Sequence, residues 1–436
     1  MKKLIKKYYN SNKEITHNFI WRALQIIGKQ GITFYIFILC AKILSPYDFG
    51  IYNYSLTVVY FLIMFGDFGI STATSKYVSE YNIINKEKLK SILFNSGIII
   101  LILTILITVL TLTIGPGYLK EKYIYVLYLL PLIFLAPMTS LYDGIYRGLK
   151  KFKRLALISL ITGAFSIGFI YFFVQNYGLI GALIIQNIFY LVLLVSLGFG
   201  YREFNFKFDK DTVKNIVVYG FTFGLAMMGY YLFSRIGVLI LGYYNYINEI
   251  AVYELLNKIF IIILMPLTVI GTVVAPNFTE YYIQKKYELI LLKFKKYFII
   301  FFVLAIIFTF LSYLILPLIF SVFLKEYYNS LFSVMLIPVT IFYSSLVYGT
   351  VINIGIIIAT GHVKIMSYSN IILGVGNVIL SLILINYFGF MTVIYATLIF
   401  HMISIIFCHT AYYIKIKNLT KETAGYNIID KQTLRL

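Results

Sequence analysis

Residues 91–115 form an uncharged run, SILFNSGIIILILTILITVLTLTIG. At a rise of about 1.5 Å per residue, a helix of this length crosses the roughly 30 Å hydrocarbon core of a bilayer. Similar runs recur along the 436 residues, of which 61% are apolar or aromatic and only 12% are charged, with a mean hydropathy of +0.88. This composition excludes a soluble multidomain enzyme. It predicts an all-α integral membrane protein.

Counting the apolar runs predicts about twelve transmembrane helices, because irregular backbone is not tolerated against lipid. We expect two six-helix lobes: an N-terminal lobe at residues 1–205 with a basic tail, and a C-terminal lobe at residues 206–436. The connections are too short to fold separately, which disfavours polytopic glycosyltransferases, polymerases and ligases. The expected spans are residues 17–44, 49–75, 91–115, 123–146, 154–175, 178–200, 213–243, 249–276, 294–320, 328–359, 364–386 and 390–414.

The basic residues are distributed unevenly about these spans. With the amino terminus inside, the two tails and the even-numbered connections hold 29 of the 37 lysines and arginines, and the outer connections hold four. Such a bias is the positive-inside signal of cytoplasmic loops. We therefore expect a multi-pass protein of the cytoplasmic membrane with both termini in the cytoplasm. The net charge of +20 is explained by topology and by contact with membrane lipids, without nucleic acid as a partner.

The two halves show similar punctuation in the same orientation. Gly148 and the span ending at Gly178 are answered by Gly361 and the span ending at Gly389, at offsets of 213 and 211. Earlier in the chain, residues 50–52 match residues 251–253 at an offset of 201. Six spans per half would give a parallel repeat about an axis along the membrane normal, with substrate held between the lobes.

Four short stretches resemble a known family: LSPYDFGIY at 44–52, FGDFGISTAT at 65–74, KYVSEY at 76–81 and ATGHVK at 359–364. They are similar to polysaccharide or O-antigen repeat-unit flippases of the Wzx type, within the multidrug/oligosaccharidyl-lipid/polysaccharide exporter superfamily. Two positions depart from the pattern: Ser45 stands for the usual glycine, and Ala251 stands at the expected glycine of the second half.

The resemblance implies a V-shaped pair of lobes that moves an isoprenoid-diphosphate-linked oligosaccharide across the membrane by alternating access. The implied partners are the lipid-linked substrate, membrane lipids, and enzymes of the pathway such as a polysaccharide polymerase and glycosyltransferases. Cation-coupled multidrug export within the same superfamily is the alternative, and a polytopic glycosyltransferase, polymerase or ligase is the second alternative.

Charged side chains inside a span indicate a polar cavity or a partner, because each costs about 2.5–3.5 kcal/mol to insert. On the first expected helix, Arg22, Gln25, Lys29 and Thr33 share one face. In the second half, Arg235 is the only strong charge within its span. Guanidinium and ammonium donors suit a diphosphate, so Arg22, Lys29 and Arg235 are the predicted substrate-binding residues.

Three further charges are candidates for ion coupling or for ion pairs. Asp67 lies between Gly66 and Gly69, where it either pairs with a cation of the first helix or binds a coupling ion. Glu254 and Lys258 are one helical turn apart, and we expect them to neutralise each other.

The sequence contains no nucleophile elbow, phosphate-binding glycine loop or metal-ligand spacing. We therefore expect no catalytic residue, no metal site and no cofactor, so that the protein is not an enzyme. Proton or sodium coupling stays open.

Overall fold

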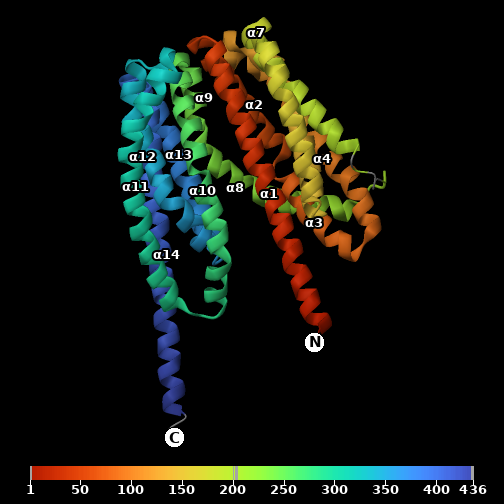
Figure 1. The fold of residues 1–436 in the computed structure, drawn as a ribbon, viewed down its shortest axis with the longest axis vertical. Helices are drawn as coiled ribbons and strands as arrows, with labels where there is room; N and C mark the ends of the chain where they lie inside the picture. Colours follow the sequence, from red (N-terminus) through yellow and green to blue (C-terminus); the bar gives the residue numbers. More distant parts are fainter. Residues whose placement is uncertain (1, 200, 202–204, 434–436) are drawn as a thin grey trace. The chain divides into compact units, whose positions relative to one another are not determined.

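The computed structural model describes residues 2–199, 201 and 205–433, and every regular element within them is a helix. The all-α fold class is thus confirmed. The chain divides into two compact units, Met1–Met228 and Gly229–Leu436, so the boundary lies within a helix, α8, rather than near residue 205. Figure 1 shows the helices coloured along the sequence.

The first unit contains long helices joined by short turns. A short helical turn, η1, precedes α5, and α8 continues from this unit into the next. The elements are α1 (Lys2–Ile43), α2 (Pro46–Asp67), α3 (Ile70–Ile84), α4 (Lys86–Leu119), η1 (Lys120–Lys122), α5 (Tyr123–Tyr128), α6 (Leu132–Gly148), α7 (Phe152–Phe199) and α8 (Lys210–Ser234).

The second unit also contains long helices joined by short turns, with one π-helical segment, η3, directly after α12. Its elements are α9 (Ile236–Tyr243), α10 (Ile247–Ile283), α11 (Tyr287–Phe323), η2 (Lys325–Tyr327), α12 (Ser330–Ile352), η3 (Asn353–Ile358), α13 (Val363–Phe388) and α14 (Met391–Thr433).

Within the described residues, nine helical segments are long and apolar enough to cross a membrane. Four of the expected spans explain the difference from twelve, because two merge into one helix and two are divided. The spans at 154–175 and 178–200 both fall in α7, which is interrupted at Gly178 (φ 54°). The span at 123–146 is divided between α5 and α6, and the span at 213–243 between α8 and α9. The number twelve stays a prediction.

Two helices continue past a proline at the end of an expected span. The structure continues α4 through Pro116 to Leu119, and α10 through Pro276 to Ile283. A proline removes one backbone hydrogen bond. A helix that ended within the membrane would leave several backbone N–H and C=O groups without hydrogen bonds. The helices therefore continue until they reach residues that can end them.

Close packing of helices in the first unit depends on glycine. A methyl group added at Gly28 of α1 would lie 2.2 Å from Leu160 of α7, and one at Gly163 of α7 would lie 2.6 Å from Ile32 of α1. Likewise, a methyl at Gly144 of α6 would lie 2.4 Å from the carbonyl of Ser71 in α3. Small residues let helix backbones approach in this way inside membranes, so α1 lies along α7 and α6 along α3 (Figure 1).

The turns of the two units recur at matching intervals. The start of α10 lies 201 residues after that of α2, and α11 starts 201 residues after α4. Helix α13 starts 211 residues after α7, and Gly178 and Gly389, both with positive φ, are also 211 apart. The expected match of Gly148 with Gly361 is therefore two residues off: Gly361 (φ 83°) corresponds to Lys150 (φ 57°).

The segment before α8 is tied to α4 of the first unit. Asn95 of α4 donates to the carbonyl of Lys207 (3.1 Å) and accepts from the backbone N–H of Asp209 (2.9 Å). Lys88 pairs with Asp209 at 3.2 Å. The hydroxyl of Thr212 and the Lys88 ammonium hold the pKa of Asp209 below its ordinary value. Residues 205–209 thus belong to the first unit, although the sequence suggested a boundary there.

Candidate functional site

Two arginines share one carboxylate between α1 and α6. Arg147 Nε lies 2.6 Å from Asp143 Oδ2, and Arg22 Nη1 lies 3.8 Å from Asp143 Oδ1. Gln25 completes the group: Arg22 donates to its Oε1, and its Nε2 donates to Asp143 at 3.1 Å. The three charged side chains are about one-quarter to one-third exposed. The group therefore carries one net positive charge and remains accessible.

Backbone packing positions this cluster. Gly144 and Gly148 follow Asp143 and Arg147 on α6, and their missing side chains let α6 lie directly against Ser71 and Ser75 of α3. With the glycines turned to α3, the neighbouring positions Asp143 and Arg147 are directed to Arg22 of α1. The G-x-x-x-G spacing thus fixes both the helix contact and the charged group beside it.

Asp67 ends α2 at a break in the helix. Phe68 (φ 35°) and Gly69 (φ 82°) adopt the left-handed conformation, and α3 begins at Ile70. The Asp67 carboxylate accepts hydrogen bonds from the backbone N–H (2.8 Å) and the hydroxyl (2.7 Å) of Ser71. It caps the first turn of α3, where a negative charge is favoured. The ion pair of α1 is formed with Asp143 instead.

Lys29 lies two turns beyond Arg22 on α1 and its side chain is exposed. Within the described part of the chain, none of the ion pairs involves Lys29. The carbonyl of Lys29 accepts from the Thr33 hydroxyl at 2.7 Å. The side chains of Arg22 and Gln25 are thus engaged in the cluster, while the side chain of Lys29 is exposed.

Arg235 separates α8 from α9 and forms a buried ion pair. Its Nη1 lies 2.7 Å from Oε2 of Glu254 on α10, whose side chain is 6% exposed. Asn257 donates to the other carboxylate oxygen at 3.2 Å and accepts from the Tyr343 hydroxyl of α12 at 3.0 Å. The chain of hydrogen bonds joins three helices of the second unit.

This arrangement changes the expected role of two residues. Glu254 was expected to pair with Lys258, and the guanidinium of Arg235 also binds its carboxylate, where a planar fork donates in a fixed geometry. Lys258 lies one turn further along α10, is half-buried, and interacts electrostatically with both charges. Arg235, expected as a free cation for substrate, is already neutralised.

The charges sort five of the six predicted site residues into three groups. Arg22 belongs to the Asp143 cluster, Asp67 caps α3, and Arg235 with Glu254 and nearby Lys258 forms the network of the second unit. Lys29 stands apart on the polar face of α1. Among the residues described, no three His, Cys, Asp or Glu side chains gather as ligands for a metal ion.

Comparison with known sequences adds the family. The profile of the family described as "Polysaccharide biosynthesis protein" matches residues 15–282, which is more than half of the chain. The chain belongs to the polysaccharide biosynthesis protein family. A search of curated proteins gave no match.

Three solved structures similar in fold to this polysaccharide biosynthesis protein are described as a flippase or transporters. A lipid II flippase, MurJ, in an inward closed conformation has a TM-score of 0.70 at 18% identity, over 94% of this chain and 93% of that one. An inward-facing multidrug resistance MATE family transporter of the MOP superfamily has a TM-score of 0.67 at 17% identity, over 92% and 96%. A MOP superfamily transporter from Pyrococcus furiosus, noted for a binding pocket of reversed polarity, has 0.57 at 16%, over 94% and 96%. The chain thus has the fold of a multi-pass membrane transporter.

Two residues of the cluster in this family member were not singled out from the sequence. Arg147 was counted as part of a basic connection, and Asp143 was not considered. A signal was nevertheless present, because Asp143 is the only acidic residue between Glu121 and Glu203. An isolated acid one turn before an arginine indicates a buried or partly buried ion pair, here with one glycine directly after the acid and another directly after the arginine.

Proposed function

We propose that this protein is a flippase that moves an isoprenoid-diphosphate-linked oligosaccharide across the cytoplasmic membrane, by alternating access between its two units. The observation that carries the proposal is the charge of the polar face of α1. There, Arg22 and Arg147 share one carboxylate, and the exposed Lys29 lies two turns further on. This face has a net positive charge, which a diphosphate would complement.

Membership of the polysaccharide biosynthesis family supports a substrate of that pathway. The fold shared with a lipid II flippase supports transport of a lipid-linked molecule, and it does not require covalent chemistry. The Arg235–Glu254 pair is assigned a different role here from the one expected for Arg235. It holds the broken helix α8–α9 to α10, while Lys29 and Arg22 contact the diphosphate.

Cation-coupled drug export is the second candidate, because MATE transporters share the fold. A cavity for cationic drugs would need acidic groups free to bind them. Asp67, Asp143 and Glu254 are each held by hydrogen bonds or arginine. The engagement of these three acids favours an anionic substrate. An enzyme that forms glycosidic bonds is a third candidate, for which this site offers no nucleophile or base placed beside a binding pocket.

The test is transport by the purified full chain in liposomes. We expect a fluorescent lipid-linked oligosaccharide to reach the opposite leaflet chemically unchanged, and Lys29→Ala to lower the rate at least tenfold. Lys29→Arg should retain most of the rate. Gln30→Ala, an exposed neighbour outside the polar stripe, is the matched control. Equal rates for Lys29→Ala and wild type, export of a cationic dye instead, or a new glycosidic product would each reject the proposal.

The remaining expectations belong to the same proposal. Both termini would lie in the cytoplasm, and the substrate would come from glycosyltransferases and pass to a polymerase. Imposing a proton or a sodium gradient on the same liposomes distinguishes the two coupling ions. A rate independent of both gradients would assign the driving force to the substrate itself.

A further inference from the structure

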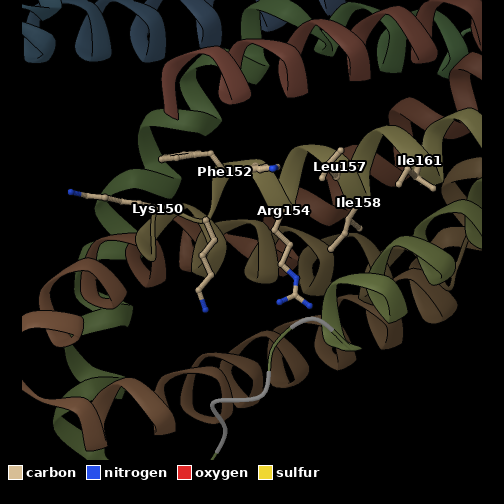
Figure 2. A pocket seen from close by; sticks show the side chains of 8 residues that line it. Lys150, Phe152, Arg154, Leu157, Ile158 and Ile161 are labelled. Atoms are coloured by element: carbon tan, nitrogen blue, oxygen red, sulfur yellow. The ribbon is translucent and has the colours of Figure 1, made fainter. Parts of the chain in front are cut away.

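A basic pocket lies at the turn between α6 and α7. It is an open hollow of about 500 Å³, lined by Lys150, Lys151, Phe152, Lys153, Arg154, Leu157, Ile158 and Ile161. Figure 2 shows the basic side chains at the start of α7 and the apolar ones up to two turns further along it. Two cations thus precede α7, at Lys150 and Lys151, and two lie in its first turn, at Lys153 and Arg154, before the apolar residues.

The backbone holds the first two cations in a defined turn. Lys150 has a left-handed conformation (φ 57°), its N–H donates to the carbonyl of Arg147 (3.0 Å), and that of Lys151 donates to Tyr146 (2.9 Å). These two bonds form a Schellman motif, which usually has glycine where Lys150 stands. The corresponding turn of the second unit has Gly361 in that conformation. The lysine is therefore not required by the turn itself.

No acid balances these four cations. Among the described residues, none of them takes part in an ion pair, and all four side chains are exposed. The preceding acid, Asp143, is already shared by Arg22 and Arg147. In the sequence, the next acid after Asp143 is Glu203. The pocket is therefore electropositive and would attract an anion.

The apolar part of the pocket is open to the surroundings of the helix. Leu157 and Ile161 are 40% and 55% exposed, and they lie four residues apart on one face of α7. Ile158 packs behind them on the buried cluster of Tyr146, Leu155, Leu193 and Leu197. The apolar surface follows directly after the cations along the chain. A phospholipid has the same order, with a charged headgroup followed by an acyl chain.

We propose that this pocket binds an anionic phospholipid of the bilayer, with its phosphate on Lys150, Lys151, Lys153 and Arg154 and an acyl chain along Leu157 and Ile161. Charge complementarity selects the anionic headgroup, since basic pockets at the ends of transmembrane helices bind such lipids. The apolar surface selects a lipid over a free phosphate. The inference is independent of what the protein transports, because it concerns a resident lipid at the α6–α7 turn.

The only tryptophan of the chain reports on this pocket. Trp21 of α1 lies beside it, with the Lys153 ammonium 5.6 Å from the indole ring. Lipids with brominated acyl chains quench tryptophan fluorescence on contact. In bilayers of zwitterionic lipid, we expect brominated phosphatidylglycerol to quench Trp21 at a mole fraction about fivefold lower than brominated phosphatidylcholine. Equal quenching by the two lipids would overturn the proposal.

Two matched triple variants test whether anionic lipid binds specifically at this pocket or is attracted equally to any basic loop. The triple variant Lys150→Gln/Lys151→Gln/Arg154→Gln keeps Lys153 beside Trp21 and should lose the anionic preference. The control is Lys285→Gln/Lys286→Gln/Lys293→Gln at the α10–α11 turn. Lys285 also has a left-handed conformation (φ 54°) in the same type of turn, so backbone strain is matched. If both triple variants lose the preference equally, or neither does, no specific site exists.

Competition distinguishes the sources of phosphate. Unlabelled phosphatidylglycerol should restore the fluorescence, whereas inorganic phosphate should not. If a polyprenyl phosphate restores it at a tenfold lower mole fraction than phosphatidylglycerol, the pocket is a docking site for the transported lipid and the phospholipid assignment is wrong. Transport is not measured in any of these arms, so their failure leaves the proposed flippase function to its own test.

Discussion

Arg235 and Glu254 hold each other at 2.7 Å, but they are buried to different degrees: about one-third of the Arg235 side chain is exposed and only 6% of Glu254. Losing one partner of a buried pair costs about 3–5 kcal/mol, because the other charge is left uncompensated. The cost depends on which charge remains. A remaining arginine reaches water, whereas a remaining glutamate does not.

We therefore expect Arg235→Gln to destabilise the protein more than Glu254→Gln does, and the double variant to be more stable than Arg235→Gln alone. The free energy of unfolding in mixed micelles measures all three. Glu280→Gln, an exposed acid on the same helix, is the control and should change little. Equal losses in both single variants would contradict the assigned asymmetry.

The Asp143 cluster should show unequal coupling to its two arginines. Partly exposed ion pairs contribute about 0.2–1 kcal/mol, and Asp143 lies at 2.6 Å from Arg147 but 3.8 Å from Arg22. Double-mutant cycles with Asp143→Asn and either Arg147→Gln or Arg22→Gln measure each coupling. We expect the Arg147 cycle to give the larger value. The reverse order would place the principal partner of Asp143 on α1.

Glycine-to-alanine changes should have opposite effects at packed and open positions. At Gly148 an added methyl would lie 2.6 Å from the Ser75 carbonyl and 2.7 Å from Val78, so Gly148→Ala should destabilise by about 1–3 kcal/mol. Gly97 and Gly168 have no atom within 4 Å of that position. Alanine there should be neutral or stabilising by up to about 1 kcal/mol, because it favours the helix. Thermal unfolding in detergent compares the three variants.

Stability should fall on acidification because of His362, in the turn before α13. The buried ring contacts the Thr360 hydroxyl at 3.1 Å, and burial, together with Lys415, holds the pKa of His362 below its ordinary value of 6.5. The unfolded chain then takes up a proton at a higher pH than the folded chain. The stabilisation that neutral His362 gives the folded chain is complete above about pH 6.5 and is lost as the pH falls below it. We expect the decrease in Tm between pH 7.5 and 5.5 to be smaller in His362→Asn. An unchanged decrease would exclude His362 as its source.

The positive-inside distribution predicts the orientation. Cysteines placed at Asn82 and Asn418 should resist an impermeant thiol reagent applied outside intact cells, and a cysteine at Glu121 should react. The native Cys40 and Cys408 are buried and give little background. Reaction at both Asn82 and Asn418 would invert the topology.

Apolar runs predicted most of the helices because a bilayer leaves the backbone few alternatives to them. The polar face of α1 followed from helical spacing, and Arg22, Gln25 and Lys29 do lie along one helix. Their partners did not follow, because spacing along one helix does not say which other helix lies beside it. Asp143 is 121 residues from Arg22, and the glycines of α6 that bring them together act through a third helix, α3.

The same limit explains the second unit. Glu254 and Lys258 are neighbours along α10, so the sequence favoured their pairing. The helix break at Arg235 brings a guanidinium to Glu254 as well, which the sequence did not indicate. Position 235 is neither a proline nor a glycine, so the residue at the break between α8 and α9 does not itself predict it.

The hydrogen bonds between Asn95 and residues 207–209 have a mechanical consequence. A connecting segment that is fastened along α4 contributes no spare length between the units. Any displacement of one unit against the other must then be absorbed beyond that anchor, within α8, where the first unit ends at Met228 and the second begins at Gly229. The pivot would be a continuous helix, so that bending and twisting stiffness, and not the slack of a loop, would set how far and how fast the units move.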